Sequence, residues 1–211
     1  SVVNVDGQGG SDTLTFALHN TAVSVDLTSD IGGTDGFIGT ASTGPMGFED
    51  INVLVGTALD PVTDPDTLTG INAAASWVVD AVLMNQYISA RTLDFSAMEN
   101  LTGEGGVDTF TVSVSHTGDV AGQGGNDIFN LREASIITGD LLGGAGEDTF
   151  DFNDVGDILK TAHVIGNVDG GASTTLGDTL NFADSDLDVL TTIDGSGTLH
   201  GQTGTVLDDP G

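Results

Sequence analysis

Short stretches of the chain alternate apolar and polar side chains with a period of two. In residues 108–114, Phe110, Val112 and Val114 fall on one side, and threonine and serine fall on the other. This alternation predicts β-strands with one buried and one solvent-facing side. Residues 72–91 also fit a helical stripe, but the β-branched run after Trp77 favours a strand there.

A glycine-rich motif precedes several of these strands. It reads G-x-x-G-x-D, followed by Thr or Ile and then by Leu or Phe. Complete copies occupy residues 7–14, 103–110, 122–129 and 143–150, and degenerate copies lie at 66–70 and 170–180. Glycines permit the tight, left-handed backbone of a turn, and Asp ends the turn by accepting hydrogen bonds from nearby amides. Each copy therefore predicts one turn and the strand that leaves it.

The spacing of the motif predicts the fold class. Asp108, Asp127 and Asp148 lie 19 and 21 residues apart, a spacing that matches one coil of a parallel β solenoid. The prediction is an all-β chain, a right-handed parallel β-helix or β-roll-like solenoid with coils of about 20 residues. Stacked coils would place the apolar residues that follow the motif aspartates in one interior column, made of Leu14, Phe110, Phe129, Phe150 and Leu180.

A longer recurrence bears on domain organisation. The pattern F-x-x-[IM]-x-x-L-x-G occurs at 48–56 and 95–103 and indicates two imperfect larger repeats, roughly 1–94 and 95–211. No shift in composition marks a linker, so we expect a single domain over 1–211, with an exposed Pro- and Asp-rich loop at 57–66. Because residue 1 is Ser rather than Met, we expect a processed chain or a segment of a longer protein.

The charge excludes several classes of partner. The 211 residues include 32 Asp and Glu against 3 Lys and Arg, for a formal net charge of −29. Nucleic-acid binding and membrane-surface binding both need a basic face, so neither is expected. No apolar run reaches the roughly 18 residues of a membrane-spanning helix. The chain has no Cys, so it has no disulfide or thiolate site.

No combination of side chains in the sequence indicates a catalytic site. The histidines show no paired spacing; they are His19, His116, His163 and His200. A polyuronate substrate calls for cationic groups, and the chain offers only Arg91, Arg132 and Lys160. We therefore expect a protein that is not an enzyme.

The motif resembles that of a known family. Residues 143–151 (GGAGEDTFD) match G-G-x-G-x-D-x-U-x, in which U is a large apolar residue, and residues 95–110 are similar to the ENLTG…DTF repeats of large bacterial secreted and surface adhesin-type proteins. The chain thus resembles the RTX, or haemolysin-type calcium-binding, repeat family. The resemblance implies an extracellular or bacterial cell-surface location and calcium as a cofactor. It implies metal ligands at Asp108, Asp127 and Asp148, and more weakly at Asp12 and Asp178.

The residues themselves leave two roles open for these aspartates. Stacked coils would bring the three carboxylates to about 5 Å from one another, where each pair repels by roughly 3 kcal/mol. Either a cation lies between them, and Ca²⁺ suits carboxylate and glycine carbonyl oxygens, or the side chains turn to cap backbone amides.

Together these features predict a noncatalytic, extracellular structural or adhesive segment of a bacterial surface or secreted protein. We expect it to be stabilised by calcium and to associate with itself end to end, or to continue into further repeats, with surface polysaccharide as a further partner. The alternative is the noncatalytic part of a secreted polysaccharide-active enzyme.

Overall fold

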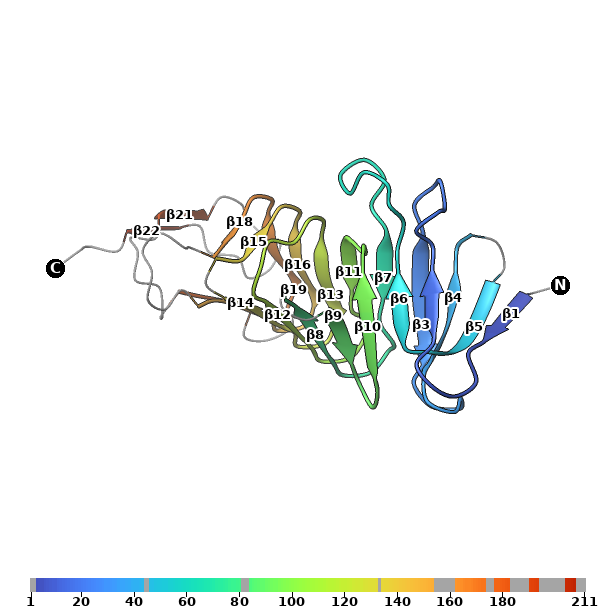
Figure 1. Cartoon of the computed structure of the whole chain (residues 1–211). Coiled ribbons are helices and arrows are strands. Elements are labelled where there is room, and N and C mark those ends of the chain that lie inside the picture. Colours follow the sequence, from blue (N-terminus) through green and yellow to red (C-terminus); the bar gives the residue numbers. More distant parts are fainter. Residues whose placement is uncertain are drawn as a thin grey trace.

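Two large β-sheets account for most of the molecule (Figure 1). The computed structural model describes residues 3–43, 46–80, 84–132, 134–153, 162–173, 177–182, 190–193 and 204–207, and every regular element among them is a strand. We call the sheets A and B. No helix in this part of the chain is long and apolar enough to span a membrane.

Each large sheet has nine strands, and their order in space differs from their order along the chain. From one edge to the other, sheet A contains β1 (Val3–Asp6), β5 (Met46–Ile51), β4 (Phe37–Ala41), β3 (Ser24–Ser29), β7 (Thr67–Thr69), β11 (Asn100–Thr102), β13 (Val120–Gly124), β16 (Leu141–Ala145) and β19 (Val168–Ala172). Sheet B contains β2 (Thr13–Thr15), β6 (Val53–Val55), β10 (Thr92–Ser96), β9 (Asn85–Ile88), β8 (Ala75–Val79), β12 (Asp108–Val112), β14 (Ile128–Leu131), β17 (Thr149–Phe152) and β20 (Thr179–Asn181). Two small sheets pair β15 (Ile136–Ile137) with β18 (His163–Val164), and β21 (Leu190–Ile193) with β22 (Gly204–Leu207).

The prediction of a right-handed parallel β-helix or β-roll-like solenoid is wrong, although the chain is all-β. Strand β4 runs antiparallel to both β3 and β5, and β9 runs antiparallel to both β8 and β10. Both large sheets are therefore mixed, and their layout is of the sandwich or jelly-roll type. The physical reason is that β4 and β9 lie in stretches, 30–51 and 80–96, that carry no copy of the glycine motif to continue the parallel repeat.

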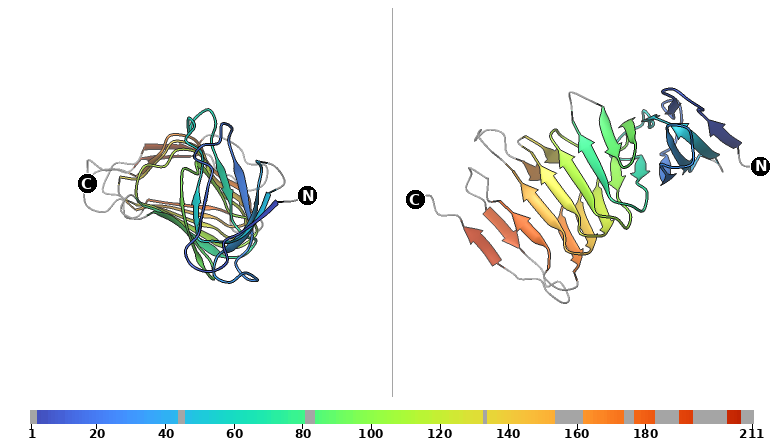
Figure 2. Two further views of the ribbon diagram at one scale, coloured as in Figure 1. Left: turned by 45° about the vertical axis from the view of Figure 1, so that its right-hand side comes forward. Right: turned by 90° about the horizontal axis from the view of Figure 1, so that it is seen from below.

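The strands after β10 pair only in parallel within the two large sheets. The chain alternates between the sheets in this region, so that β11, β13, β16 and β19 line up in sheet A while β12, β14, β17 and β20 line up in sheet B (Figure 2). We call each consecutive pair of strands, one per sheet, a unit. The predicted spacing of 19 and 21 residues is the length of such a unit, since Phe110 pairs with Phe129 and Phe129 pairs with Phe150.

The core between the sheets contains a column of stacked rings. Trp77, Phe110, Phe129 and Phe150 are nearly parallel to their neighbours, with ring centroids 5.4, 5.1 and 4.8 Å apart. The predicted burial of the three phenylalanines is confirmed, because each is at most 2% exposed. Leu14 is half-buried and pairs with Leu54 in another part of sheet B, and Leu180 is 37% exposed.

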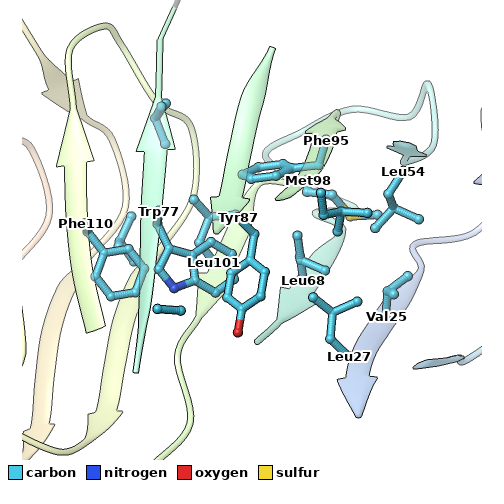
Figure 3. Close-up of a cluster of buried hydrophobic side chains, with 14 of the residues drawn as sticks. Val25, Leu27, Leu54, Leu68, Trp77, Tyr87, Phe95, Met98, Leu101 and Phe110 are labelled. Atoms are coloured by element: carbon cyan, nitrogen blue, oxygen red, sulfur yellow. The ribbon is translucent and has the colours of Figure 1, made fainter. Parts of the chain in front are cut away.

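The described part of the stretch 72–91 contains the strands β8 and β9 and no helix, as the β-branched residues predicted. Strands β8 and β9 pair antiparallel with Trp77 opposite Tyr87, whose ring centroids are 4.6 Å apart (Figure 3). The buried Tyr87 hydroxyl accepts a hydrogen bond from the Ile71 amide at 3.0 Å. This hairpin supplies the first ring of the aromatic column.

Candidate functional site

Four of the five predicted ligands form one column at the start of the sheet-B strands. The Asp108 amide donates to Oδ1 of Asp127 at 2.8 Å, the Asp127 amide donates to Oδ1 of Asp148 at 2.8 Å, and the Asp148 amide donates to Oδ1 of Asp178 at 2.9 Å. We call Asp108, Asp127, Asp148 and Asp178 the motif column. Each carboxylate from Asp127 onward thus caps the amide that begins the neighbouring strand.

The fifth predicted ligand, Asp12, lies apart from the motif column. It precedes β2, which pairs with β6 at the N-terminal end of sheet B. The Asp12 amide donates to Oδ1 of Asn52 at 3.0 Å, so the same capping arrangement recurs there with Asn52 as the acceptor.

The degenerate copy at 66–70 leads into sheet A rather than sheet B. The buried Asp66 carboxylate accepts hydrogen bonds from the amides of Val23 and Thr57, and the Asp66 amide donates to Oε2 of Glu99 at 2.8 Å. Burial raises the pKa of Glu99. This copy therefore keeps the capping role of the motif but uses it in the other sheet.

The first glycine of each complete copy in the parallel region packs directly against the motif carboxylate. A β-carbon on Gly103, Gly122 or Gly143 would lie less than 3.0 Å from Oδ2 of the aspartate five residues later. It would also lie less than 3.0 Å from the carbonyl oxygen of the corresponding glycine in the following unit. This close approach of carboxylate, carbonyl and backbone explains why glycine is needed at this position.

The carboxylates of the first three members of the motif column, Asp108, Asp127 and Asp148, are buried and only partly paired, whereas Asp178 is exposed. Asp108, Asp127 and Asp148 are at most 1% exposed. Both oxygens of Asp108, and Oδ2 of Asp127 and of Asp148, have no hydrogen-bond partner in the described part of the chain. An unpaired charge in such a place is costly, so the site favours either a proton or a cation.

The pKa values of these carboxyl groups follow from this burial. Burial, with help from the Asp127 charge, raises the pKa of Asp108 to about 6. Burial likewise raises the pKa of Asp148 to about 6, and the charges of Asp127 and Asp178 add to the effect. The pKa of Asp127 is raised by burial as well. Asp108 and Asp148 therefore change their protonation between mildly acidic and neutral pH.

A second column of capping residues was not predicted. The Asp119 amide donates to Oδ1 of Asn100 at 3.0 Å, the Asp140 amide to Oδ1 of Asp119 at 2.7 Å, and the Asn167 amide to Oδ1 of Asp140 at 2.7 Å. We call Asn100, Asp119, Asp140 and Asn167 the second column; it marks the start of the sheet-A strands. The sequence does carry a signal for it, an Asn or Asp three residues before the first glycine of each copy, as in Asp119 before Gly122.

The two columns cap in opposite directions along the stack of units. In the motif column the acceptor belongs to the following unit, as in Asp127 capping Asp108. In the second column the acceptor belongs to the preceding unit, as in Asp119 capping Asp140. Each inner unit is thereby bonded to both of its neighbours by side chains as well as by strand pairing.

His116 and Arg91 lie away from the motif column and have local contacts of their own. His116 is 6% exposed, and burial lowers its pKa to about 4, so it is neutral at pH 7. It lines a shallow hollow with Met98 and Glu99. Arg91 donates to backbone carbonyls of the loop between β3 and β4, including those of Gly33 and Gly36. Lys160 and His200 lie outside the described residues.

The chemistry of the motif column fits calcium, with one restriction. Nowhere in the described ranges do three His, Cys, Asp or Glu side chains gather as a metal site. The motif carboxylates instead form a row with one per unit, beside glycine carbonyl oxygens such as those of Gly122 and Gly143. Ca²⁺ accepts such mixed oxygen ligands, so backbone carbonyls would have to complete its coordination.

Comparison with known proteins gives no further guide, because no family model, curated protein or solved structure matches the chain.

Proposed function

We propose that this chain is a noncatalytic structural or adhesive segment of an extracellular bacterial surface or secreted protein, and that calcium at the motif column stabilises its fold. The observation that supports this most is the row of buried carboxylates of Asp108, Asp127 and Asp148, whose oxygens are only partly hydrogen-bonded. The resemblance of residues 143–151 to the RTX nonapeptide points to the same cation.

Electrostatics favours a divalent cation at this place. The chain carries a formal net charge of −29, and Asp108, Asp127 and Asp148 place three carboxylates in a buried row. Neighbouring charges about 5 Å apart repel by roughly 3 kcal/mol at an effective dielectric constant near 20. A bound Ca²⁺ would remove this repulsion while leaving Oδ1 of Asp127, Asp148 and Asp178 bonded to the amides that they cap.

The ligand set suits weak binding of the kind that extracellular proteins use. Extracellular calcium modules bind in the range of about 10⁻⁴ to 10⁻³ M, and fewer carboxylates per ion lower the affinity. The motif column offers one carboxylate per unit, with glycine carbonyls beside it. We therefore expect calcium to act as a structural ion at millimolar concentration.

Thermal unfolding followed by circular dichroism tests the proposal. The parent chain, Asp127→Asn and the control Asp26→Asn are each melted at pH 7.5 with CaCl₂, with MgCl₂ at equal ionic strength, and with EDTA. Asn at 127 retains the oxygen that accepts from the Asp108 amide, whereas Asp26 is an exposed residue of β3 outside the column.

We expect calcium to raise the Tm of the parent and of Asp26→Asn, and to raise that of Asp127→Asn much less. A ligand present at 100 times its Kd stabilises a fold by about 2.7 kcal/mol, which is easily measured. Equal Tm values for the parent in calcium and EDTA would overturn the proposal. An unchanged calcium response in Asp127→Asn would also overturn it.

A further inference from the structure

We infer that copies of this chain associate end to end, with β1 and β2 of one copy pairing with β19 and β20 of the next. This extends the proposed structural function by naming a partner, a second copy of the same chain, and it does not require calcium. Strands β1 and β2 are the outermost strands at one end of sheets A and B, and β19 and β20 are outermost at the other. Figure 1 shows β1 and β19 far apart along the molecule.

The strand directions at the two ends match. Each antiparallel strand, β4 or β9, lies between two strands to which it is antiparallel, so the strands on its two sides run the same way. All other pairs in the large sheets are parallel. Consequently β1 runs in the direction of β19, and β2 in that of β20. A second copy placed end to end would extend both sheets by parallel pairs.

At both ends of sheet B, every second residue of the outermost strand points its backbone N–H and C=O groups away from the sheet, and these groups at the two ends could bond to each other. The Thr179 amide donates to the Asp148 carbonyl at 2.7 Å, so the amide and carbonyl of Leu180 point away from β17. At the other end the Phe16 amide donates to the Val55 carbonyl at 2.8 Å. By alternation, Thr13 and Thr15 point their backbone groups away from β6.

These groups define one register for the contact in sheet B. In a parallel pair, a residue bonds to the two residues that flank its partner. Leu180 of one copy would therefore bond to Thr13 and Thr15 of the next and would pair with Leu14. The same relation holds inside the molecule, where Phe150 pairs with Leu180.

Sheet A gives an equivalent register. The Leu141 amide donates to the Asn167 carbonyl at 2.8 Å, which leaves Val168 pointing its backbone groups away from β16. The Gly7 amide donates to the Glu49 carbonyl at 3.0 Å, which leaves Asn4 and Asp6 pointing away from β5. Val168 of one copy would pair with Val5 of the next.

The side chains at the two ends are also complementary. Val168 and Leu180 occupy positions that are buried in the preceding unit, yet they are 38% and 37% exposed, against 0% for Leu141 and 2% for Phe150. At the other end, Leu14 and Val5 are half-buried against the core. The contact would cover Leu180 with Leu14 and Val168 with Val5, and so would extend the apolar pairs Phe150–Leu180 in sheet B and Leu141–Val168 in sheet A.

The motif column would continue across the same contact. Within the chain, the amide of each motif aspartate donates to Oδ1 of the next, and the last acceptor is Asp178. The next acceptor in this order would be Asp12 of the following copy, which precedes β2 as Asp178 precedes β20. Because this places acidic residues together, association should strengthen as salt screens them.

Analytical ultracentrifugation of the full chain in 0.5 M NaCl, over a concentration series, tests the inference. Thr13→Pro blocks the β2 edge; Thr13 is exposed and its amide faces away from β6, so no bond within the copy is lost. Leu180→Asp places a charge in the contact at the β20 edge, and Val168→Asp does so at β19. Val62→Asp, at a residue that is 76% exposed in the loop after β6, is the matched control.

We expect the parent and Val62→Asp to form species larger than dimers as concentration rises. Each end variant should associate at least about tenfold more weakly. An equimolar mixture of Thr13→Pro and Leu180→Asp should form dimers that grow no further, since each copy keeps one open end and the contact joins unlike surfaces.

A parent chain that stays monomeric over the whole series would overturn the inference. Association of the Leu180→Asp and Val168→Asp variants at parental strength would also overturn it, as would a mixture that forms no dimers. Each variant is melted to show that it is folded. Because the Leu180→Asp variant keeps Asp108, Asp127 and Asp148, its calcium response tests the proposed function separately from association.

Discussion

The Asp108 amide and the Asp127 carboxylate join the starts of two neighbouring strands of sheet B, at 2.8 Å across 19 residues of sequence. Only Oδ1 of Asp127 makes this bond; Oδ2 packs near Gly122 and has no hydrogen-bond partner among the described residues. One oxygen therefore positions the backbone while the other leaves a site for a proton or cation. Capping and the proposed ligation, which the sequence left as alternatives, would use different atoms of the same carboxylate.

Substitution of Gly122 by Ala should destabilise the fold strongly. Its β-carbon would lie less than 3.0 Å from both Oδ2 of Asp127 and the carbonyl oxygen of Gly143. Overpacking of this kind costs about 1–3 kcal/mol or more. Urea denaturation measures the loss, with Gly124→Ala as the control, because a β-carbon there meets nothing closer than 3.6 Å. Equal stability of the two variants would contradict the packing described for the motif.

Substitution of Phe129 by Ala should cost about 3–5 kcal/mol of unfolding free energy. The ring is fully buried between Phe110 and Phe150, so its removal leaves a cavity between two stacked rings. Ile128→Ala, at the adjacent residue that is 37% exposed, should cost much less. A comparable loss at both positions, measured by urea denaturation, would argue against the aromatic column as a main source of stability.

Stability should fall as the pH rises from 5 to 7.5 in the presence of EDTA. The pKa values of Asp108 and Asp148 are about 6 in the folded chain, above the value of about 3.9 in unfolded chains. The folded state thus binds these protons more tightly. The resulting stabilisation is fully present below about pH 4 and is lost as the pH rises through 6, at about 1 kcal/mol per group between pH 5 and 7.5.

Thermal melts across this pH range check the slope. Asp108→Asn should reduce the slope, whereas Asp26→Asn makes the same change in net charge at an exposed site and should not. A Tm that is independent of pH, or slopes that are equal in both variants, would show that the buried carboxylates do not control it.

Substitution of Asp119 by Ala should cost about 1–2 kcal/mol, because it removes the acceptor of the Asp140 amide. Asp119→Asn retains that acceptor and should remain close to the parent in stability. Hydrogen exchange measured by NMR should show faster exchange at the Asp140 amide in Asp119→Ala alone. Equal protection in both variants would remove the second column as a stabilising element.

The local repeats were readable from the sequence, but the sheet order was not. The spacing of Asp108, Asp127 and Asp148 predicted that these residues lie side by side, and alternation predicted the burial of the phenylalanine that follows each one by two positions. Both signals are local and recur at a fixed spacing, so they survive without knowledge of the rest of the fold.

The wrong predictions concern the parts of the chain where the regular repeat of the glycine motif is interrupted or ends. The hairpin strands β4 and β9 enter the sheets antiparallel, and their partners are set by long-range packing such as Trp77 against Tyr87. Leu180 is the apolar residue of the degenerate copy at 170–180. Its strand β20 is the edge strand of sheet B, so no further strand of that sheet packs beside it, and it is 37% exposed. The second column escaped prediction because its members include both Asn and Asp and stand outside the glycine motif.

Capping in opposite directions restricts how such a chain can change in length during evolution. Loss of residues 127–147, which is one full period of 21 residues, would join Asn126 to Asp148 and leave Asp148 to cap Asp108. The same deletion would leave Asp119 to cap Asn167, so both columns would close again. A deletion that does not remove a whole unit would leave strand-starting amides without acceptors. Gene duplication and deletion in steps of a whole unit are therefore the changes that this architecture tolerates.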